Sequence, residues 1–138
     1  MIIITGSLVR LTGSGLGCEG WPGCEEGAFF PEADHHAFVE FGNRVFGIFP
    51  ITLTLLVAWF ARRRARWVFW TALAVAVLTV AEAPLGLATI RYELPPGIVI
   101  LHFLIALLAL GGAVVVALEA VRDERGGAGI SVQRDLRW

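Results

Sequence analysis

Two cysteines stand near the start of the chain, and they are the only cysteines among its 138 residues. Cys18 and Cys24 are six positions apart in a segment rich in glycine and proline, which keep the backbone out of a helix. Cysteines at this spacing in a tight turn can close a small disulfide ring where the compartment is oxidising. Two structural or free thiols are the alternative. The segment is therefore a candidate for thiol or disulfide chemistry.

A second group of chemically capable residues follows at helical spacing. Glu40, Asn43 and Arg44 are three and four positions apart, which puts them on one side of a helix, and His36 extends that side by one turn. Charges within an apolar segment are costly and usually face a bundle interior or a bound group. An ion pair between Glu40 and Arg44 that reaches the lipid headgroups is the alternative. The spacing predicts a polar helix face able to contact a ligand.

A single histidine lies inside the last apolar run of the chain. His102 falls about 8 Å below the expected start of that helix, at a rise of 1.5 Å per residue, and Asn43 lies at a similar depth. An intramembrane histidine can bind a metal centre, or it can only hydrogen-bond a neighbouring helix. Both interpretations of His102 stay open on the residues alone.

The elements that position these residues follow from the composition of the chain. Hydrophobic residues make up 57% of it and charged residues 17%, with a mean hydropathy of +0.72, which is outside the range of soluble domains. The net charge of −1 argues against nucleic acid as a partner. Since each span needs about 20 residues, the chain has room for about four helices. We predict an all-α membrane protein, a four-helix transmembrane bundle.

Three apolar segments are long enough to cross a bilayer, whereas the N-terminus is not. Residues 1–8 would rise only about 12 Å as a helix, against a hydrocarbon core of about 30 Å. We expect a partial helix over residues 1–10, the last turns of a span whose beginning is absent, followed by an external loop over residues 11–37. The predicted spans are Phe38 to Phe60, Trp67 to Ile90 and Gly97 to Leu118.

The charges are distributed unevenly between the two ends of these spans. An arginine cluster separates the first two spans, and acidic residues crowd the loop before them. Positive loops stay in the cytoplasm, so the cysteine loop is predicted outside and the C-terminus inside. Residues 122–138 mix glycines with charges, and we expect a mobile cytoplasmic tail. The clusters are Arg62, Arg63, Arg64 and Arg66 on one side, and Glu19, Glu25, Glu26, Glu32 and Asp34 on the other.

The cysteine loop and the polar face together resemble the haem A synthase family, membrane enzymes that oxidise a methyl group of haem O. Residues 8–24 look like the first external loop of that family. The run from Glu40 to Arg44 resembles its Glu-x-x-His-Arg motif in an actinobacterial variant, with Asn43 at the histidine position. An amide oxygen is a poor axial ligand for haem iron compared with imidazole, so this departure puts the second axial ligand in doubt.

The later spans carry further parts of the resemblance. Pro95 and His102 match the family's fourth-helix pattern. The run from Glu82 to Gly86 resembles its Gln-x-x-Leu-Gly, with glutamate in place of glutamine. Glu82 could join a proton path or pair with an arginine, and Pro84 should kink the helix. The family has two similar four-helix bundles in tandem, and this chain corresponds to the first.

The resemblance also assigns roles to individual residues. It makes the cysteine pair a redox-active disulfide, Glu40 the catalytic residue and His102 the axial ligand of haem iron. Asn43 would lie beside the haem, and His36 is a tentative second ligand. Arg10 and Arg44 lie near the external end, where they could hold haem propionates through charge-assisted bonds. The alternative is that each side chain extends to the lipid headgroups.

The function implied is oxidation of the C8 methyl group of haem O to the formyl group of haem A, for terminal oxidase assembly. Haem O and haem A are the implied substrate and product, with haem b a further candidate, and haem O synthase and the terminal oxidase are the implied partners. A non-catalytic, haem-binding half-bundle that needs a partner bundle or a second copy is the alternative. A membrane thiol-disulfide oxidoreductase is disfavoured, because such enzymes need a reactive Cys-x-x-Cys and usually a second pair.

Overall fold

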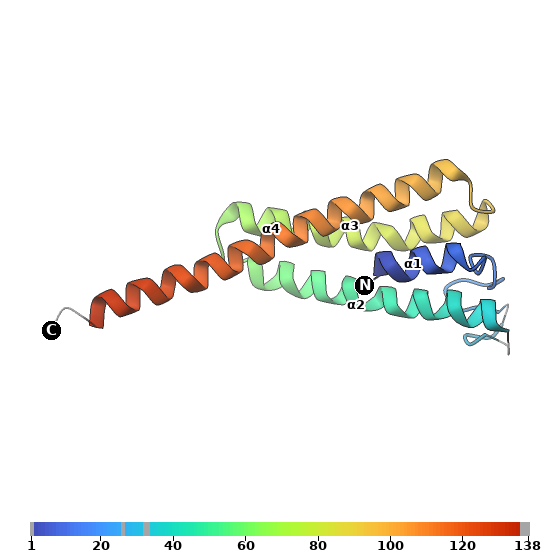
Figure 1. Cartoon of the computed structure of the whole chain (residues 1–138), viewed down its shortest axis with the longest axis horizontal. Helices are drawn as coiled ribbons and strands as arrows, with labels where there is room; N and C mark the ends of the chain where they lie inside the picture. The colour runs from blue at the N-terminus through green and yellow to red at the C-terminus, as the bar shows by residue number, and fades with distance from the viewer. Residues whose placement is uncertain (1, 26, 32–33, 136–138) are drawn as a thin grey trace.

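A computed structural model describes the backbone of residues 2–25, 27–31 and 34–135 and the side chains of those between 3 and 126. The described chain is helical apart from its loops and one isolated bridge between Glu25 and Ala28 (Figure 1). The prediction of an all-α bundle is confirmed. Residues 1, 26, 32–33 and 136–138, which include the first residue of the predicted partial helix, two of the acidic loop residues and the end of the predicted tail, lie outside the described residues. The helices are α1 (Ile2–Leu11), α2 (His35–Ala61), α3 (Arg66–Arg91) and α4 (Pro96–Asp135).

Local chemistry explains where these helices begin and end. Asp34 caps α2, because its Oδ2 accepts a hydrogen bond from the Ala37 N–H at 3.0 Å. A proline begins α4, where its fixed φ suits the first helical position. Between α3 and α4, Glu93 and Leu94 adopt left-handed φ values of 56° and 59°, which are uncommon outside glycine and reverse the chain sharply. Helix α3 runs through Pro84 without ending.

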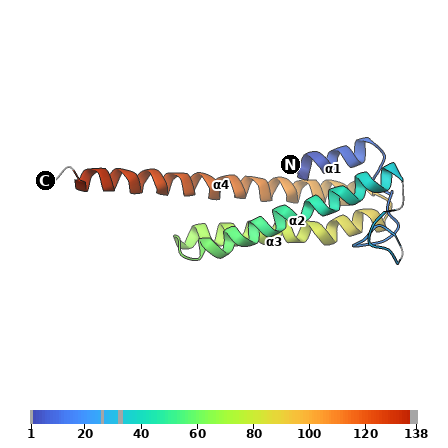
Figure 2. The same ribbon diagram turned by 90° about the horizontal axis from the view of Figure 1, so that it is seen from below.

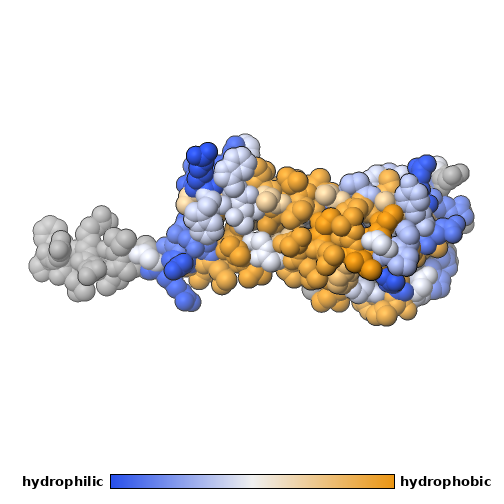
Figure 3. Space-filling view, turned by 90° about the horizontal axis from the view of Figure 1, so that it is seen from above, coloured by the Kyte–Doolittle hydropathy of each residue, from blue (hydrophilic) through white to orange (hydrophobic). Residues whose placement is uncertain are grey.

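Three helices are long and apolar enough to cross a membrane: α2, α3 and residues 96–126 of α4. Many large apolar side chains on them are exposed, among them Phe49, Leu53 and Leu108. Figure 3 shows an apolar band between two polar ends. This surface suits lipid and not water, as predicted for a membrane bundle.

The helix bounds differ from the sequence expectation at two places. Helix α2 starts three residues before the predicted Phe38, because the Asp34 cap lies upstream of the apolar run. Helix α4 continues to Asp135, where the sequence analysis expects a mobile tail from residue 122. The mobility of this segment stays a prediction.

Packing joins neighbouring helices, with α3 in contact with both α2 and α4, and α1 resting on α2. Small residues such as Ala72 and Ala76 let these helices approach closely. At Gly112, a Cβ would lie only 2.5 Å from Val75 Cγ2, so a larger residue would require a shift of the Val75 side chain or of its helix.

The ends of the bundle differ in what they carry. The cysteine loop and the α3–α4 turn lie at one end, and the α2–α3 turn lies at the other, where α4 extends beyond it (Figures 1 and 2). A Cβ at Gly15 would lie 3.2 Å from Leu94, so the loop packs against the α3–α4 turn. At the opposite end, Arg64 pairs with Asp123 of α4 at 2.7 Å. The candidate site residues therefore share the loop end.

Candidate functional site

A disulfide joins Cys18 and Cys24 in the loop that precedes α2. Both cysteines are buried, and they pack with Ala37 and Phe41 of α2. A Cβ at Gly17 would lie 2.6 Å from the carbonyl carbon of His36, so the loop backbone rests directly on the first turn of the helix. The sequence predicts a possible ring here, and the structure adds that the ring is a packed part of the bundle.

Glu40 is buried beneath this ring, with only 4% of its surface exposed. Its Oε2 accepts a hydrogen bond from the backbone N–H of Cys18 at 3.0 Å, and its Oε1 accepts one from Arg44 Nη2 at 2.6 Å. A buried carboxylate is tolerated when it is paired and hydrogen-bonded, and both oxygens here have partners. The carboxylate therefore ties α2 to the start of the disulfide ring.

Arg44 completes the attachment of the ring. Its Nη1 donates to the carbonyl of Gly20 at 2.7 Å and also to the carbonyl of Gly23, both between the two cysteines. Its Nε is buried without a partner among the described residues. The guanidinium is thus committed to the loop, which leaves little of it to contact a haem propionate.

The other polar residues of the α2 face also bond to neighbouring protein. His36 Nδ1 lies 2.9 Å from the Oγ of Ser14, a fully buried hydroxyl that also bonds Thr12. Asn43 Oδ1 accepts from Thr5 Oγ1 of α1 at 2.7 Å. Sequence reasoning did not identify Ser14 or Thr5, since hydroxyls this common carry no motif. The face predicted to meet a ligand is therefore used largely to hold α1 and the loop.

His102 lies apart from this network, on the side of α4 that packs against α3. Its Nδ1 is 2.9 Å from Glu82 Oε2, an ion-pair distance, but the two groups lack the alignment of a full hydrogen bond. A Cβ at Gly86, one turn after Glu82, would lie 3.9 Å from His102 Cε1. No described residue bonds Nε2 of this imidazole. Glu82 therefore faces a histidine and not an arginine, and its place in a proton path stays a prediction.

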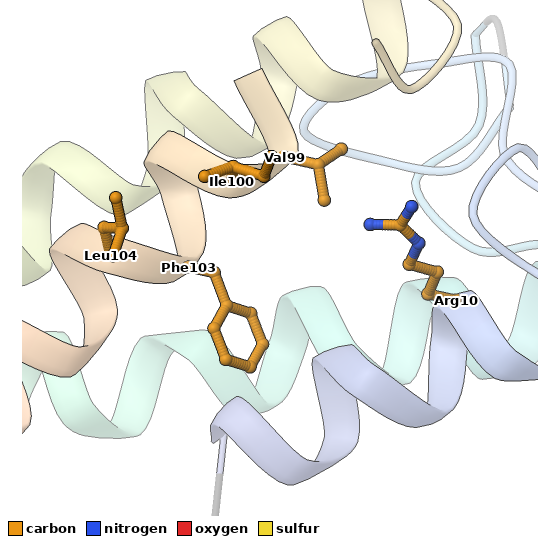
Figure 4. Close-up of a pocket in the computed structure, with 5 residues that line it drawn as sticks. All are labelled: Arg10, Val99, Ile100, Phe103 and Leu104. Atoms are coloured by element: carbon orange, nitrogen blue, oxygen red, sulfur yellow. The ribbon is translucent and has the colours of Figure 1, made fainter. Parts of the chain in front are cut away.

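Arg10 borders a cleft between α1 and α4 of about 220 Å³. Figure 4 shows its guanidinium facing apolar side chains of α4. The cleft combines one cation with an otherwise apolar lining, a combination that suits a flat apolar molecule with an acidic edge. The α4 residues that line it are Val99, Ile100, Phe103 and Leu104.

The predicted site residues thus fall into two groups. Cys18, Cys24, Glu40 and Arg44 form one closed network, whereas His102 stands with Glu82 across the bundle. Within the described part of the chain, no group of three or more histidine, cysteine or acidic side chains could hold a bare metal ion. A metal at His102 would need most of its ligands from a cofactor.

Comparison with known proteins identifies similar sequences. Residues 29–138 match the COX15-CtaA family of cytochrome oxidase assembly proteins. The chain is 27% identical over 144 residues to the heme A synthase of Lysinibacillus sphaericus, covering 100% of the chain and 47% of that protein. It is 33% identical over 129 residues to the heme A synthase of Symbiobacterium thermophilum, covering 91% of the chain and 42% of that protein. The chain spans less than half the length of these relatives, and no solved structure matches it.

The network around Arg44 predicts how the disulfide responds to reductant. We expect Arg44→Ala to speed reduction of Cys18–Cys24 by roughly a hundredfold, since breaking a buried ion pair costs about 3 kcal/mol at the low end of the usual range. The measurement is the rate of thiol release in detergent with a phosphine reductant, followed by mass tagging.

Arg91→Ala is the matched control, because Arg91 is an exposed arginine at the end of α3. Its reduction rate should equal that of the parent. Equal rates for Arg44→Ala and the parent would contradict the assignment of Arg44 as the anchor of the ring.

Proposed function

The chain belongs to the haem A synthase family of cytochrome oxidase assembly proteins, and we propose that it binds haem O through His102 and takes part in oxidation of the C8 methyl group to formyl. The family is one of membrane proteins involved in haem A biosynthesis. The observation that supports the proposal most directly is an intramembrane imidazole, His102, whose Nε2 has no described partner. Haem O synthase and a terminal oxidase are the partners we propose from the family.

The residues present fit a haem at one axial position. A porphyrin brings four nitrogen ligands, so a single imidazole is enough for the protein to hold the iron. Gly86 leaves room beside the His102 ring, and Arg10 offers a cation for a propionate at the edge of an apolar cleft. The cleft is smaller than the roughly 300–1,000 Å³ of complete ligand pockets, so we assign it one edge of the macrocycle.

When bound, haem iron would supply the oxidation chemistry, and the protein supplies ligation, orientation and a site with little water. We propose that His102 Nε2 binds the iron and that Arg10 orients a propionate. We assign Arg44 to the loop in place of a propionate. Asn43 Oδ1 bonds Thr5, so Asn43 is not favoured as a second ligand, whereas His36 bonds Ser14 through Nδ1 and stays a tentative second ligand.

Glu40 is the catalytic residue that we propose from the family motif. Its Oε1 and Oε2 each accept one hydrogen bond, from Arg44 and from the Cys18 N–H, and only 4% of Glu40 is exposed, so a proton donor from outside reaches the carboxylate only if its cover moves. The disulfide loop carries both the Cys18 donor and the carbonyls that hold Arg44. Movement of that loop is therefore the step that we propose for making Glu40 available.

A non-catalytic haem-binding half-bundle is the second candidate. It is favoured by the length of the chain, which spans less than half of the relatives it matches. The candidates differ in product: turnover converts haem O to haem A, whereas binding alone does not. A thiol-disulfide oxidoreductase is not favoured, because both cysteines are buried from an attacking thiolate.

For orientation, we propose that the cysteine loop faces the outside and the α2–α3 turn the cytoplasm. The turn carries the arginine cluster, and Arg62 stacks over the Trp59 ring at 3.3 Å. Arginine and tryptophan together suit a cytoplasmic interface.

The ligand assignment predicts that His102→Ala loses the Soret absorbance of the full chain reconstituted with haem b. No other histidine lies within a span at this depth, and the alanine side chain has no atom that can bind the iron. His35→Ala is the control, because His35 is exposed at the start of α2 and should leave the spectrum as it is. An unaltered spectrum and affinity in His102→Ala would reject haem binding through His102.

The catalytic assignment predicts that Glu40→Gln keeps bound haem but lowers conversion of haem O by at least about a hundredfold. Glutamine can still accept from Cys18, whereas it lacks a carboxylate that can exchange a proton. Glu19→Gln, the same change at an exposed carboxylate of the loop, should convert haem O at the parent rate. Full activity in Glu40→Gln would leave Glu40 a structural ion-pair partner, and an inactive parent that binds haem would favour the half-bundle.

The orientation predicts which positions an impermeant maleimide reaches in intact cells. Glu19→Cys, in a chain with both native cysteines changed to serine, should be labelled, because Glu19 is exposed and the loop faces outside. Arg63→Cys, in a chain with both native cysteines changed to serine, should be labelled only after the membrane is opened. The reverse pattern would overturn the orientation.

A further inference from the structure

Glu82 is a carboxylate inside a membrane-spanning helix, and no part of the proposed reaction uses it. Its side chain is 19% exposed, and its Oε1 is buried without a hydrogen-bond partner among the described residues. Charged and polar groups at such depth are costly and mark a function or a specific partner. Its described partner is His102.

We infer that Glu82 is a positioning residue that holds the His102 imidazole by its Nδ1 and so turns Nε2 toward the haem iron. This inference rests on the proposed function, in which His102 ligates that iron. The inference concerns Glu82 of α3, which orients the proposed ligand His102 on α4.

Two distances to the imidazole ring of His102 support this inference. Glu82 Oε2 lies 2.9 Å from Nδ1, and a Cβ placed on Gly86, one helical turn later, would lie 3.9 Å from Cε1. Both residues belong to α3, which packs closely against α4 along its length. The imidazole is therefore placed against one wall of α3, with its Nδ1 edge toward the carboxylate.

The position of Glu82 beside Nδ1 affects which nitrogen of His102 is free to bind a metal. A neutral imidazole carries one N–H, and the nitrogen without the proton is the one that binds a metal. An acceptor beside Nδ1 favours the tautomer with hydrogen on Nδ1 and the lone pair on Nε2. Metal-bound histidines usually donate their other N–H to a carboxylate, a carbonyl or water, which fixes the ring and strengthens the ligand. The imperfect alignment in the ligand-free chain would then tighten when the iron is bound.

The test compares three variants of the full chain with the parent. Glu82→Leu removes the acceptor at similar size, Glu82→Gln keeps an acceptor oxygen, and Glu119→Leu makes the same change at a partly buried carboxylate of α4, toward the α2–α3 turn. The readouts are haem b affinity, the absorption spectrum and midpoint potential of the bound haem, and the ¹⁵N shifts of the imidazole in the haem-free protein.

We expect Glu82→Leu to weaken haem b binding roughly 10–100-fold, the usual cost of losing such a partner, and to move the midpoint potential upward. Glu82→Gln should restore most of the affinity, and Glu119→Leu should match the parent. In the haem-free chain, the fraction of His102 that carries its proton on Nδ1 should fall in Glu82→Leu.

Two results would overturn the inference. One is parent-like affinity, potential and tautomer in Glu82→Leu, and the other is equal loss in Glu82→Gln and Glu82→Leu. If Glu82→Leu does not fold, Glu82→Ala takes its place, and parent-like affinity, potential and tautomer in Glu82→Ala count against the inference. The result of His102→Ala separates the two proposals: haem retained there rejects the proposed function, whereas haem lost there with Glu82 variants unaffected rejects only the positioning role.

Discussion

The ion pair between Glu40 and Arg44 is the interaction on which the loop end of the bundle depends. Two charges buried within an apolar bundle are stable only when their hydrogen-bonding capacity is largely filled. Here the backbone of the disulfide ring fills it, through the Cys18 N–H and the carbonyls of Gly20 and Gly23. The same bonds satisfy loop backbone groups that would otherwise face apolar surroundings. The ring, the first turns of α2 and the buried carboxylate therefore form one unit, whose parts respond together.

The same constraint has a different outcome between α3 and α4. Glu82 and His102 also lie within spans, but Glu82 Oε1 has no partner in the described chain, and Nδ1 of His102 is not well aligned. Unfilled bonding capacity in a membrane bundle is costly, and a bound group that engages the imidazole offsets part of that cost. The network around Glu40 thus holds the disulfide loop in place, and the incompletely bonded pair suits a ligand site.

The arrangement of the helices keeps these two groups apart while leaving access between them. Helix α1 rests on α2, and its Arg10 faces α4 across a cleft with apolar lining. The other residues that line this cleft belong to α4, the helix that also carries His102.

Hydropathy and charge by themselves determined the class of this protein, because a span needs only a local run of apolar residues, and such runs are readable without knowledge of their neighbours. The local motif of Cys18 and Cys24, and the spacing of Glu40 and Arg44, also indicated a ring and a polar helix face. The sequence did not determine the end of α4, since glycines and charges after residue 122 are compatible with helix or coil.

Only the tertiary structure decided which partner each polar group has. Asn43 bonds Thr5, and His36 bonds Ser14. Arg44 bonds a backbone carbonyl of the disulfide ring, whereas the sequence suggested a haem propionate as its partner. Glu82 faces His102 and not an arginine. These contacts join residues that are about 20 or more positions apart, and their geometry depends on how the helices pack and how the loop folds back onto α2. A periodic pattern identifies the face of a helix, but the group opposite that face is set by the fold of the whole chain.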